Sequence, residues 1–458
     1  MLPESSMRKL MHNSVFFYYN QNMEKAKEIH AEFWKYAQLG SGRAFLIFRE
    51  HQELDFTQEI IQLCLKCYAY DPQCEGDRSE YAMQFIRALP QKERECVFAS
   101  IKPHLENDKV SDDWDCIHFF SVVVKIAHEF DPSFGELLRK RFDECDDDAL
   151  IEGFPSSAVI ELDGFDGMVR AARKFGKAFK VHDDWYADDY YTCCVPGMKS
   201  ESVRAKLAEL AESDQDIRAY LERIEECEKE AEEIKAERKK NEPESNFERV
   251  KKALHTGRGL APRRYVKKLT LDEAKYFADE MKTVKSQKEL IKYLWMFSDI
   301  PYPYDAKDLL SLLSKRKNSN FNDRLVDALS LLTSPEIRLL AEKALDSNKY
   351  SPFYLALLIK NYREGDGAKI ARKLKEIKDF EDAHYDVLEL GDIYNENVTP
   401  DCLEPLKIFY ERSKCGLCRT RAAELMEKAG VLPQNIREEL PFDSETLYDQ
   451  ELQEARNQ

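Results

Sequence analysis

The segment from about Val284 to Glu439 is a run of amphipathic helical stretches separated by short breaks, and it constrains the fold more than any other feature. Its best-defined stretch is SPEIRLLAEKALDS at 334–347. Each stretch has an apolar stripe too broad for a helix that stands alone in water. Neighbouring helices must therefore cover one another, as they do in a stacked solenoid.

The composition favours helix along the whole chain. Only 16 glycines and 17 prolines occur in 458 residues, and 34% of the residues are charged. A sequence poor in helix breakers and rich in Glu, Lys, Leu and Ala favours helix over sheet. We therefore predict an all-α protein, built as an α-solenoid of helical hairpins with a protruding long-helix arm.

The pattern along the chain predicts six successive parts. The helical period is lost after His182, and an apolar 3–4 spacing on a highly charged helix returns between Ile217 and Ile234. The expected parts are an N-terminal helical domain with room for irregular repeats at 1–181, an acidic–aromatic loop at 182–200, a long charged helical arm at 201–246, a basic linker at 247–268, helical repeats at 269–440 and a C-terminal tail at 441–458.

Two stretches of the repeat part share a pattern. In IRLLAEKAL (337–345) and CRTRAAELM (418–426), Arg338 matches Arg419 and Ala341 matches Ala422. This succession of a turn, an apolar residue, an arginine and an alanine resembles HEAT-like helical repeats, and the chain is similar to HEAT-repeat proteins of bacteria. The resemblance implies an α-solenoid. We expect the four matched residues to serve packing and hydrogen bonding within the stack.

The sharpest candidate for a binding site is the segment 249–268, which contains no acidic residue. Its cations, with His255 and Tyr265 among them, can grip phosphates or an acidic protein surface. The alternative is pairing within the chain, because 143–189 is rich in Asp and Glu. The candidate binding residues are Arg249, Lys251, Lys252, Arg258, Arg263, Arg264, Lys267 and Lys268.

A second candidate is the acidic–aromatic stretch from His182 to Tyr191. Its carboxylates can recognise a basic peptide or hold a divalent metal, but adjacent carboxylates diverge and the glycine-containing calcium loop is absent. The alternative is a solvated loop with Trp185 and Tyr190 turned inward. The candidate residues are Asp183, Asp184, Trp185, Asp188 and Asp189.

Other motifs indicate structure rather than chemistry. The Cys-x-x-Cys pairs at 64/67 and 415/418 lie far apart in amphipathic helices, where a thiol packs as a small apolar group. In DPQCEGDR (71–78), Asp71 and Glu75 are expected to serve the start of the next helix. Because no common catalytic motif occurs, we predict no catalytic residue, no metal and no cofactor. An enzyme stays open, since triads assemble in space.

We expect a non-enzymatic protein–protein interaction scaffold, whose partner is a basic or amphipathic protein or peptide. The alternative is a nucleic-acid-binding or DNA-repair protein that uses 249–268, since some HEAT-like solenoids are DNA glycosylases. The net charge of −17 disfavours nucleic acid at long range. Without a signal peptide or a long apolar run, and with 12 cysteines suited to reduced thiols, we expect a cytoplasmic protein with no membrane partner.

Overall fold

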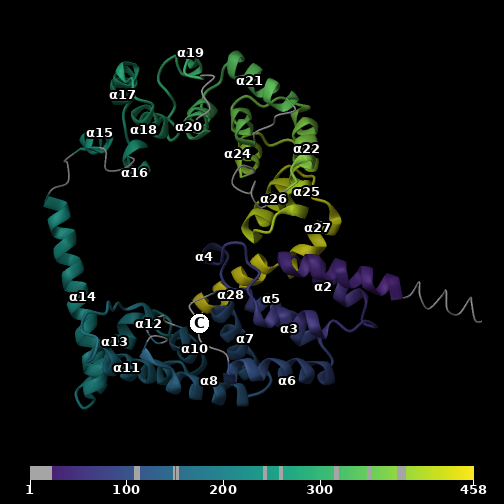
Figure 1. Ribbon diagram of the computed structural model, residues 1–458, viewed down its shortest axis with the longest axis vertical. Helices are drawn as coiled ribbons and strands as arrows, with labels where there is room; N and C mark the ends of the chain where they lie inside the picture. The colour runs from purple at the N-terminus through teal and green to yellow at the C-terminus, as the bar shows by residue number, and fades with distance from the viewer. Residues whose placement is uncertain are drawn as a thin grey trace, which may run out of the picture. The chain divides into compact units, whose positions relative to one another are not determined.

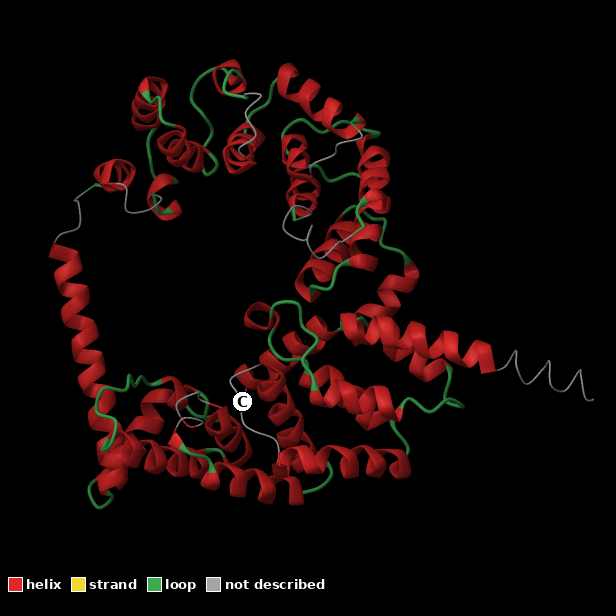
Figure 2. Cartoon of the chain, in the orientation of Figure 1, coloured by secondary structure: helices red, strands yellow, loops and turns green. Residues whose placement is uncertain are grey.

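The computed structural model describes residues 23–107, 114–147, 150, 154–240, 245–256, 261–313, 319–347, 352–378 and 388–457. Within these ranges the regular elements are helices and no strand occurs (Figure 2). The predicted all-α fold class is therefore confirmed. None of the described helices combines the length and the apolar character that crossing a bilayer requires.

The chain divides into two compact units. Unit 1 comprises Met1–Glu233, Lys414–Leu417 and Asn435–Gln458, and unit 2 comprises Ile234–Ser413 and Cys418–Gln434. Among the described residues, the first unit therefore combines early segments of the sequence with late ones. These boundaries differ from the expected six parts, because the expected arm and the expected tail both contribute helices to unit 1.

The described part of unit 1 begins with a helical stretch at 23–39, and its further helices follow in the sequence. Its centre is formed by α3, α5 and α7, which pack against one another, and α7 also packs against α8 and α10. The elements are α2 (Gly42–Glu50), α3 (Thr57–Leu65), α4 (Pro72–Glu75), α5 (Ser79–Ala88), α6 (Gln91–Asn107), α7 (Trp114–Glu129), α8 (Ser133–Glu144), α10 (Phe154–Asp163), α11 (Phe165–Phe179), α12 (Tyr190–Cys193), α13 (Ser200–Ala211) and most of α14 (Gln215–Lys240).

The expected arm at 201–246 is divided between a packed part and an exposed part. A turn that Asp214 caps separates α13 from α14, with its Oδ1 accepting the N–H groups of Asp216 and Ile217. The apolar stripe of both helices is buried in the core of unit 1, which runs without a break from Phe33 to Cys227. From residue 228 to residue 237 the side chains are exposed. The 3–4 spacing thus marked a packing face as far as Cys227 and none beyond it.

The expected C-terminal tail folds back as part of unit 1. It contains η3 (Leu440–Phe442) and α28 (Ser444–Asn457), which follow α27 (Gln434–Glu439), and α28 packs on α5 (Figure 1). The N–H of Ser444 donates to the carbonyl of Gly40 at 2.9 Å. The rings of Phe442 and Phe45 lie 4.9 Å apart. These contacts join an early segment of the sequence to a late one.

Unit 2 contains helices that pack mainly on near neighbours in the sequence. Examples are α15 on α16 and α18, α18 on α20, α20 on η1, α21 on α22, and α22 on α25. The elements are α15 (Asn246–Thr256), α16 (Arg263–Val266), α17 (Leu271–Thr283), α18 (Gln287–Phe297), α19 (Ala306–Leu310), α20 (Ser319–Ser330), α21 (Pro335–Asp346), η1 (Pro352–Leu358), α22 (Asp366–Glu376), α24 (Glu389–Glu396), η2 (Pro400–Cys402), α25 (Leu403–Arg412) and most of α26 (Gly416–Lys428).

The stretch SPEIRLLAEKAL begins α21 in the way its sequence indicates. Ser334 caps the helix, because its hydroxyl accepts the N–H of Glu336, and Pro335 occupies the first turn. Arg338 is buried and donates to both carboxylate oxygens of Asp366, one of them at 2.8 Å, and to the carbonyl of Asn361 at 3.0 Å. This pair ties α21 to the start of α22.

The other matched positions are buried as well. Ala341 and Ala422 lie in the core, and Arg419 is almost completely enclosed, with one Nη donating to the carbonyl of Ser413 at 3.2 Å. All four matched residues therefore serve packing and hydrogen bonding inside the helical array, as expected. The identity of the repeats as HEAT-like stays a prediction.

Candidate functional site

The acidic–aromatic loop follows directly on α11 in unit 1. Val181, Tyr186 and Tyr190 are 72%, 70% and 59% exposed, which is unusual for large apolar side chains. Asp183, Asp184 and Asp188 are exposed beside them in the sequence, and Asp189 is half-buried. The loop thus presents apolar side chains and carboxylates to solvent together.

Fixed contacts hold this loop on unit 1. The ring of His182 stacks on Trp185 with centroids 4.1 Å apart, and its Nε2 lies 3.1 Å from a carboxylate oxygen of Asp147. The guanidinium of Arg223 on α14 donates from Nε to the carbonyl of Trp185 at 2.7 Å. Trp185 packs on the core as expected, whereas Tyr190 points to solvent, contrary to the inward position considered for it.

The loop carboxylates do not assemble into a metal site in the part of the chain that the structure describes. No group of three or more His, Cys, Asp or Glu side chains there has the arrangement of metal ligands. Asp188 instead accepts the N–H of Tyr190 at 3.0 Å, a local turn contact.

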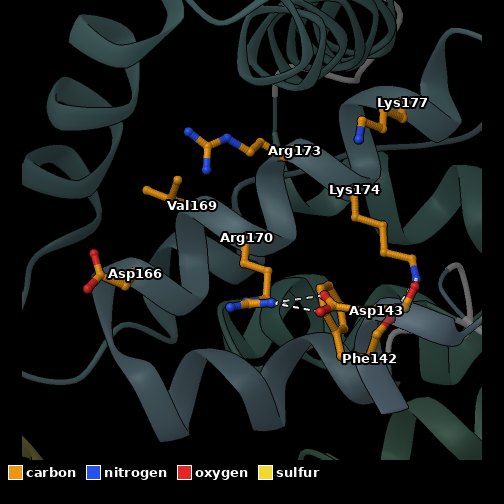
Figure 3. A pocket seen from close by; sticks show the side chains of 8 residues that line it. All are labelled: Phe142, Asp143, Asp166, Val169, Arg170, Arg173, Lys174 and Lys177. Atoms are coloured by element: carbon orange, nitrogen blue, oxygen red, sulfur yellow. Dashed lines mark hydrogen bonds and ion pairs between the residues drawn. The ribbon is translucent and has the colours of Figure 1, made fainter. Parts of the chain in front are cut away.

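A basic hollow lies against α11, where the sequence had drawn no attention. It has a volume of about 700 Å³ and is lined by α11 and the end of α8 (Figure 3). Four cations of α11 line it, namely Arg170, Arg173, Lys174 and Lys177. Their i, i+3, i+4, i+7 spacing, with no acid from residue 167 to 180, was the signal that could have located this pocket.

The basic segment 249–268 lies in unit 2, and Arg258 falls outside the described residues. Arg263 pairs through Nε with Asp299 at 2.7 Å. Burial raises the pKa of the Asp299 carboxyl, and the charge of Arg263 opposes that shift. Arg263 thus pairs with an acid of its own unit, and pairing of the segment with 143–189 stays a prediction.

Aromatic rings interleave with the cations of this segment. The guanidinium groups of Arg249 and Arg264 lie 4.7 and 4.8 Å from the ring centroid of Tyr265, and Lys251 lies 5.2 Å from that of Tyr276. Lys252, Lys267 and Lys268 are exposed. The described basic candidates therefore belong to one segment of unit 2, and the acidic candidates belong to unit 1.

The polar turn at 71–78 forms a buried ion pair. Asp71 caps α4, as expected, and Glu75 lies 3.0 Å from Arg78, with both side chains almost fully enclosed. All 12 cysteines are free thiols, and those of the two Cys-x-x-Cys pairs are buried. The Glu75–Arg78 pair is structural, because its other hydrogen bonds end on the backbone of unit 1. The four cysteines of the two pairs are structural because their side chains lie in packed interiors.

No family model, curated protein or solved structure matched the chain in the comparisons made with each. The function must therefore be argued from the surfaces that the chain's own residues form.

Proposed function

We propose that the protein is an interaction scaffold built from helical repeats, and that unit 1 binds a basic segment of a partner protein. The binding surface is the acidic–aromatic surface, defined by Val181, Asp183, Asp184, Tyr186, Asp188 and Tyr190. One observation carries the proposal: three large apolar side chains are exposed within ten residues that also carry four aspartates. Exposed apolar groups framed by charge are typical of protein-binding sites.

The chemistry of this surface suits Lys and Arg side chains. An exposed tyrosine ring attracts a cation by roughly 0.5–1 kcal/mol, and neighbouring carboxylates add ion pairs. The loop is held by the His182–Trp185 stack and by the Arg223 contact, so a ligand need not order it. Such preorganisation lowers the entropic cost of binding. The packing of unit 2 helices on near neighbours supports the scaffold role, with HEAT-like repeats as the proposed architecture.

The test uses the full chain and a fluorescent peptide in which Arg alternates with Leu. We expect binding that falls about tenfold in the variant Tyr186→Ala/Tyr190→Ala, which corresponds to about 1.4 kcal/mol. Asp183→Asn/Asp184→Asn should weaken binding too. The matched control, Glu232→Gln/Glu233→Gln, neutralises two exposed acids of α14 in the same unit. Equal losses in the two acid variants would reduce the result to non-specific attraction to an acidic protein and refute the site.

Nucleic-acid binding by unit 2 is a second candidate, favoured by the cation–aromatic interleaving at Tyr265 and Tyr276. Cations that track phosphates and rings that stack on bases are the usual elements of single-strand binding. The test is a salt titration of a labelled single strand. Affinity that does not fall with rising salt, or that survives Lys267→Glu/Lys268→Glu, would exclude this candidate.

A further inference from the structure

We propose that the basic hollow on α11, here the α11 pocket, binds a ligand that carries a phosphate group. This site is distinct from the acidic–aromatic surface and does not depend on it. Its argument begins with α11 itself, which has a buried face and a basic face. Met168, Ala171, Ala172 and Phe175 lie in the core of unit 1, whereas the cations that line the pocket extend away from it (Figure 3).

Lys174 lines the pocket, but its ammonium group is bonded to the protein backbone and is not available to a ligand. Its ammonium group donates to the carbonyls of Phe142, Asp143 and Cys145 at 2.5, 3.0 and 2.7 Å. These carbonyls belong to the C-terminal end of α8, where unsatisfied oxygens and the helix dipole would repel an anion. Lys174 neutralises that end, and we assign it a positioning role.

The three remaining cations can reach a ligand. Arg173 contacts Asp214 at 2.7 Å yet remains 52% exposed, and Lys177 is 71% exposed, with its ammonium 3.9 Å from Asp216. Arg170 donates through one Nη to both oxygens of Asp143, at 3.0 and 2.8 Å (Figure 3). The Asp143 carboxylate thus occupies the place at Arg170 that a phosphate would take.

The lining of the pocket is more basic than acidic, with four cations and two carboxylates, Asp143 and Asp166. Asp214 and Asp216 contact Arg173 and Lys177 from outside the lining, and Lys180 shares Asp216, so a bound anion would compete with these exposed contacts. A guanidinium binds phosphate through paired hydrogen bonds, and lysine adds a point charge. The volume of about 700 Å³ exceeds what one phosphate fills, and Phe142 and Val169 supply apolar walls. The ligand class is therefore a phosphate monoester of a small organic molecule or of a protein side chain.

The experiment is isothermal titration of the full chain with inorganic phosphate, pyrophosphate and a phosphoserine peptide. We expect Lys177→Gln to weaken phosphate binding about tenfold, since a charge-assisted hydrogen bond is lost. Lys180→Gln is the matched control, because Lys180 follows directly on the same helix as its C-cap and contacts Asp216 but does not line the pocket. It should leave the affinity within a factor of about two.

The variant Asp143→Asn gives the sharpest test, because the proposal predicts that it gains phosphate affinity. Because it releases Arg170, it should tighten phosphate binding several-fold, whereas Glu144→Gln, an exposed acid next to it in the chain, should not. Tighter binding of the phosphoserine peptide than of pyrophosphate would identify a protein ligand, and the reverse order a small molecule. Absence of heat with all three probes, or an unchanged or weaker affinity of Asp143→Asn, would overturn the proposal.

Discussion

The buried pair Glu75–Arg78 should be a main determinant of the stability of unit 1. The two side chains are 2% and 5% exposed. Arg78 donates to the carbonyls of Gln38 at 2.9 Å and Lys414 at 3.2 Å, and Glu75 Oε2 accepts the N–H of Gly416 at 2.8 Å. One ion pair therefore joins its own turn to Gln38, 40 residues earlier, and to the segment 414–416, more than 330 residues later.

The substitution Glu75→Gln keeps the shape and removes the charge. It leaves the Arg78 guanidinium buried without this carboxylate, which costs about 3–5 kcal/mol in comparable buried pairs. The amide offers one acceptor, so either the N–H of Asp71, now bonded to Oε1 at 2.9 Å, or that of Gly416 loses its partner. We therefore expect unit 1 to lose about 3–5 kcal/mol of unfolding free energy.

The assay is urea denaturation combined with hydrogen exchange at Gly416 and in α5, because a chain of two units need not unfold in one step. Arg223–Glu226 is a control pair of the same residue types at the same spacing, with Glu226 64% exposed. Glu226→Gln should change the free energy by less than about 0.5 kcal/mol. A Glu75→Gln effect as small as that control would refute the reasoning, as would additive effects of Glu75→Gln and Arg78→Met.

Other features of unit 1 lead to further expectations. Burial lowers the pKa of His118 from its usual 6.5, so near that pH the unfolded chain binds a proton that the folded chain does not bind. The free energy of unfolding should therefore fall as pH drops below about 6.5, and His118→Gln should remove this pH dependence from the urea midpoints. Gly176→Ala should destabilise unit 1 by about 2–3 kcal/mol although alanine has the higher helix propensity, because the new Cβ would lie 1.8 Å from the backbone oxygen of Asp216. Gly135→Ala is the control: its nearest neighbours are the methyl groups of Leu162, the closer at 3.3 Å, and thermal melts should show it nearly neutral. Burial raises the pKa of Cys64 to about 12, so iodoacetamide should modify exposed Cys193 in the native protein and leave Cys64 unmodified until unfolding, as peptide mass spectrometry would show; early labelling of Cys64 would contradict the packing.

The helical class was predictable because it depends on local properties. The scarcity of glycine and proline and the 3–4 spacing of apolar residues act within a turn or two of helix. The burial of Arg338 and Ala341 was predictable for the same reason, since their spacing places them on one face of α21. The return of α28 to unit 1 was not, because the contact between Gly40 and Ser444 joins distant residues whose local patterns carry no pairing information.

The candidate surfaces illustrate the same limit. Periodicity and composition located the acidic–aromatic loop and the basic segment, but the orientation of Tyr190 depends on which partners hold the backbone around it. The pairing of Arg263 with Asp299 could not be read from charge counts, which favoured the larger acidic group at 143–189. Total charge ranks possible partners, whereas the fold decides which acid is within 4 Å.

Charge placement also decides which ligands the two proposed sites of unit 1 can attract. An acidic chain with a net charge of −17 would repel a phosphate ligand at long range, but screening reduces that field beyond about 8 Å at physiological salt. Within the α11 pocket the cations that line it act on a ligand at shorter range than this field. Under the two proposals, the same chain attracts a basic partner at the acidic–aromatic surface and holds an anion a few helical turns earlier in the sequence. Phosphate should then alter peptide affinity only modestly and by a salt-dependent amount, because both sites lie on one unit and their coupling is electrostatic.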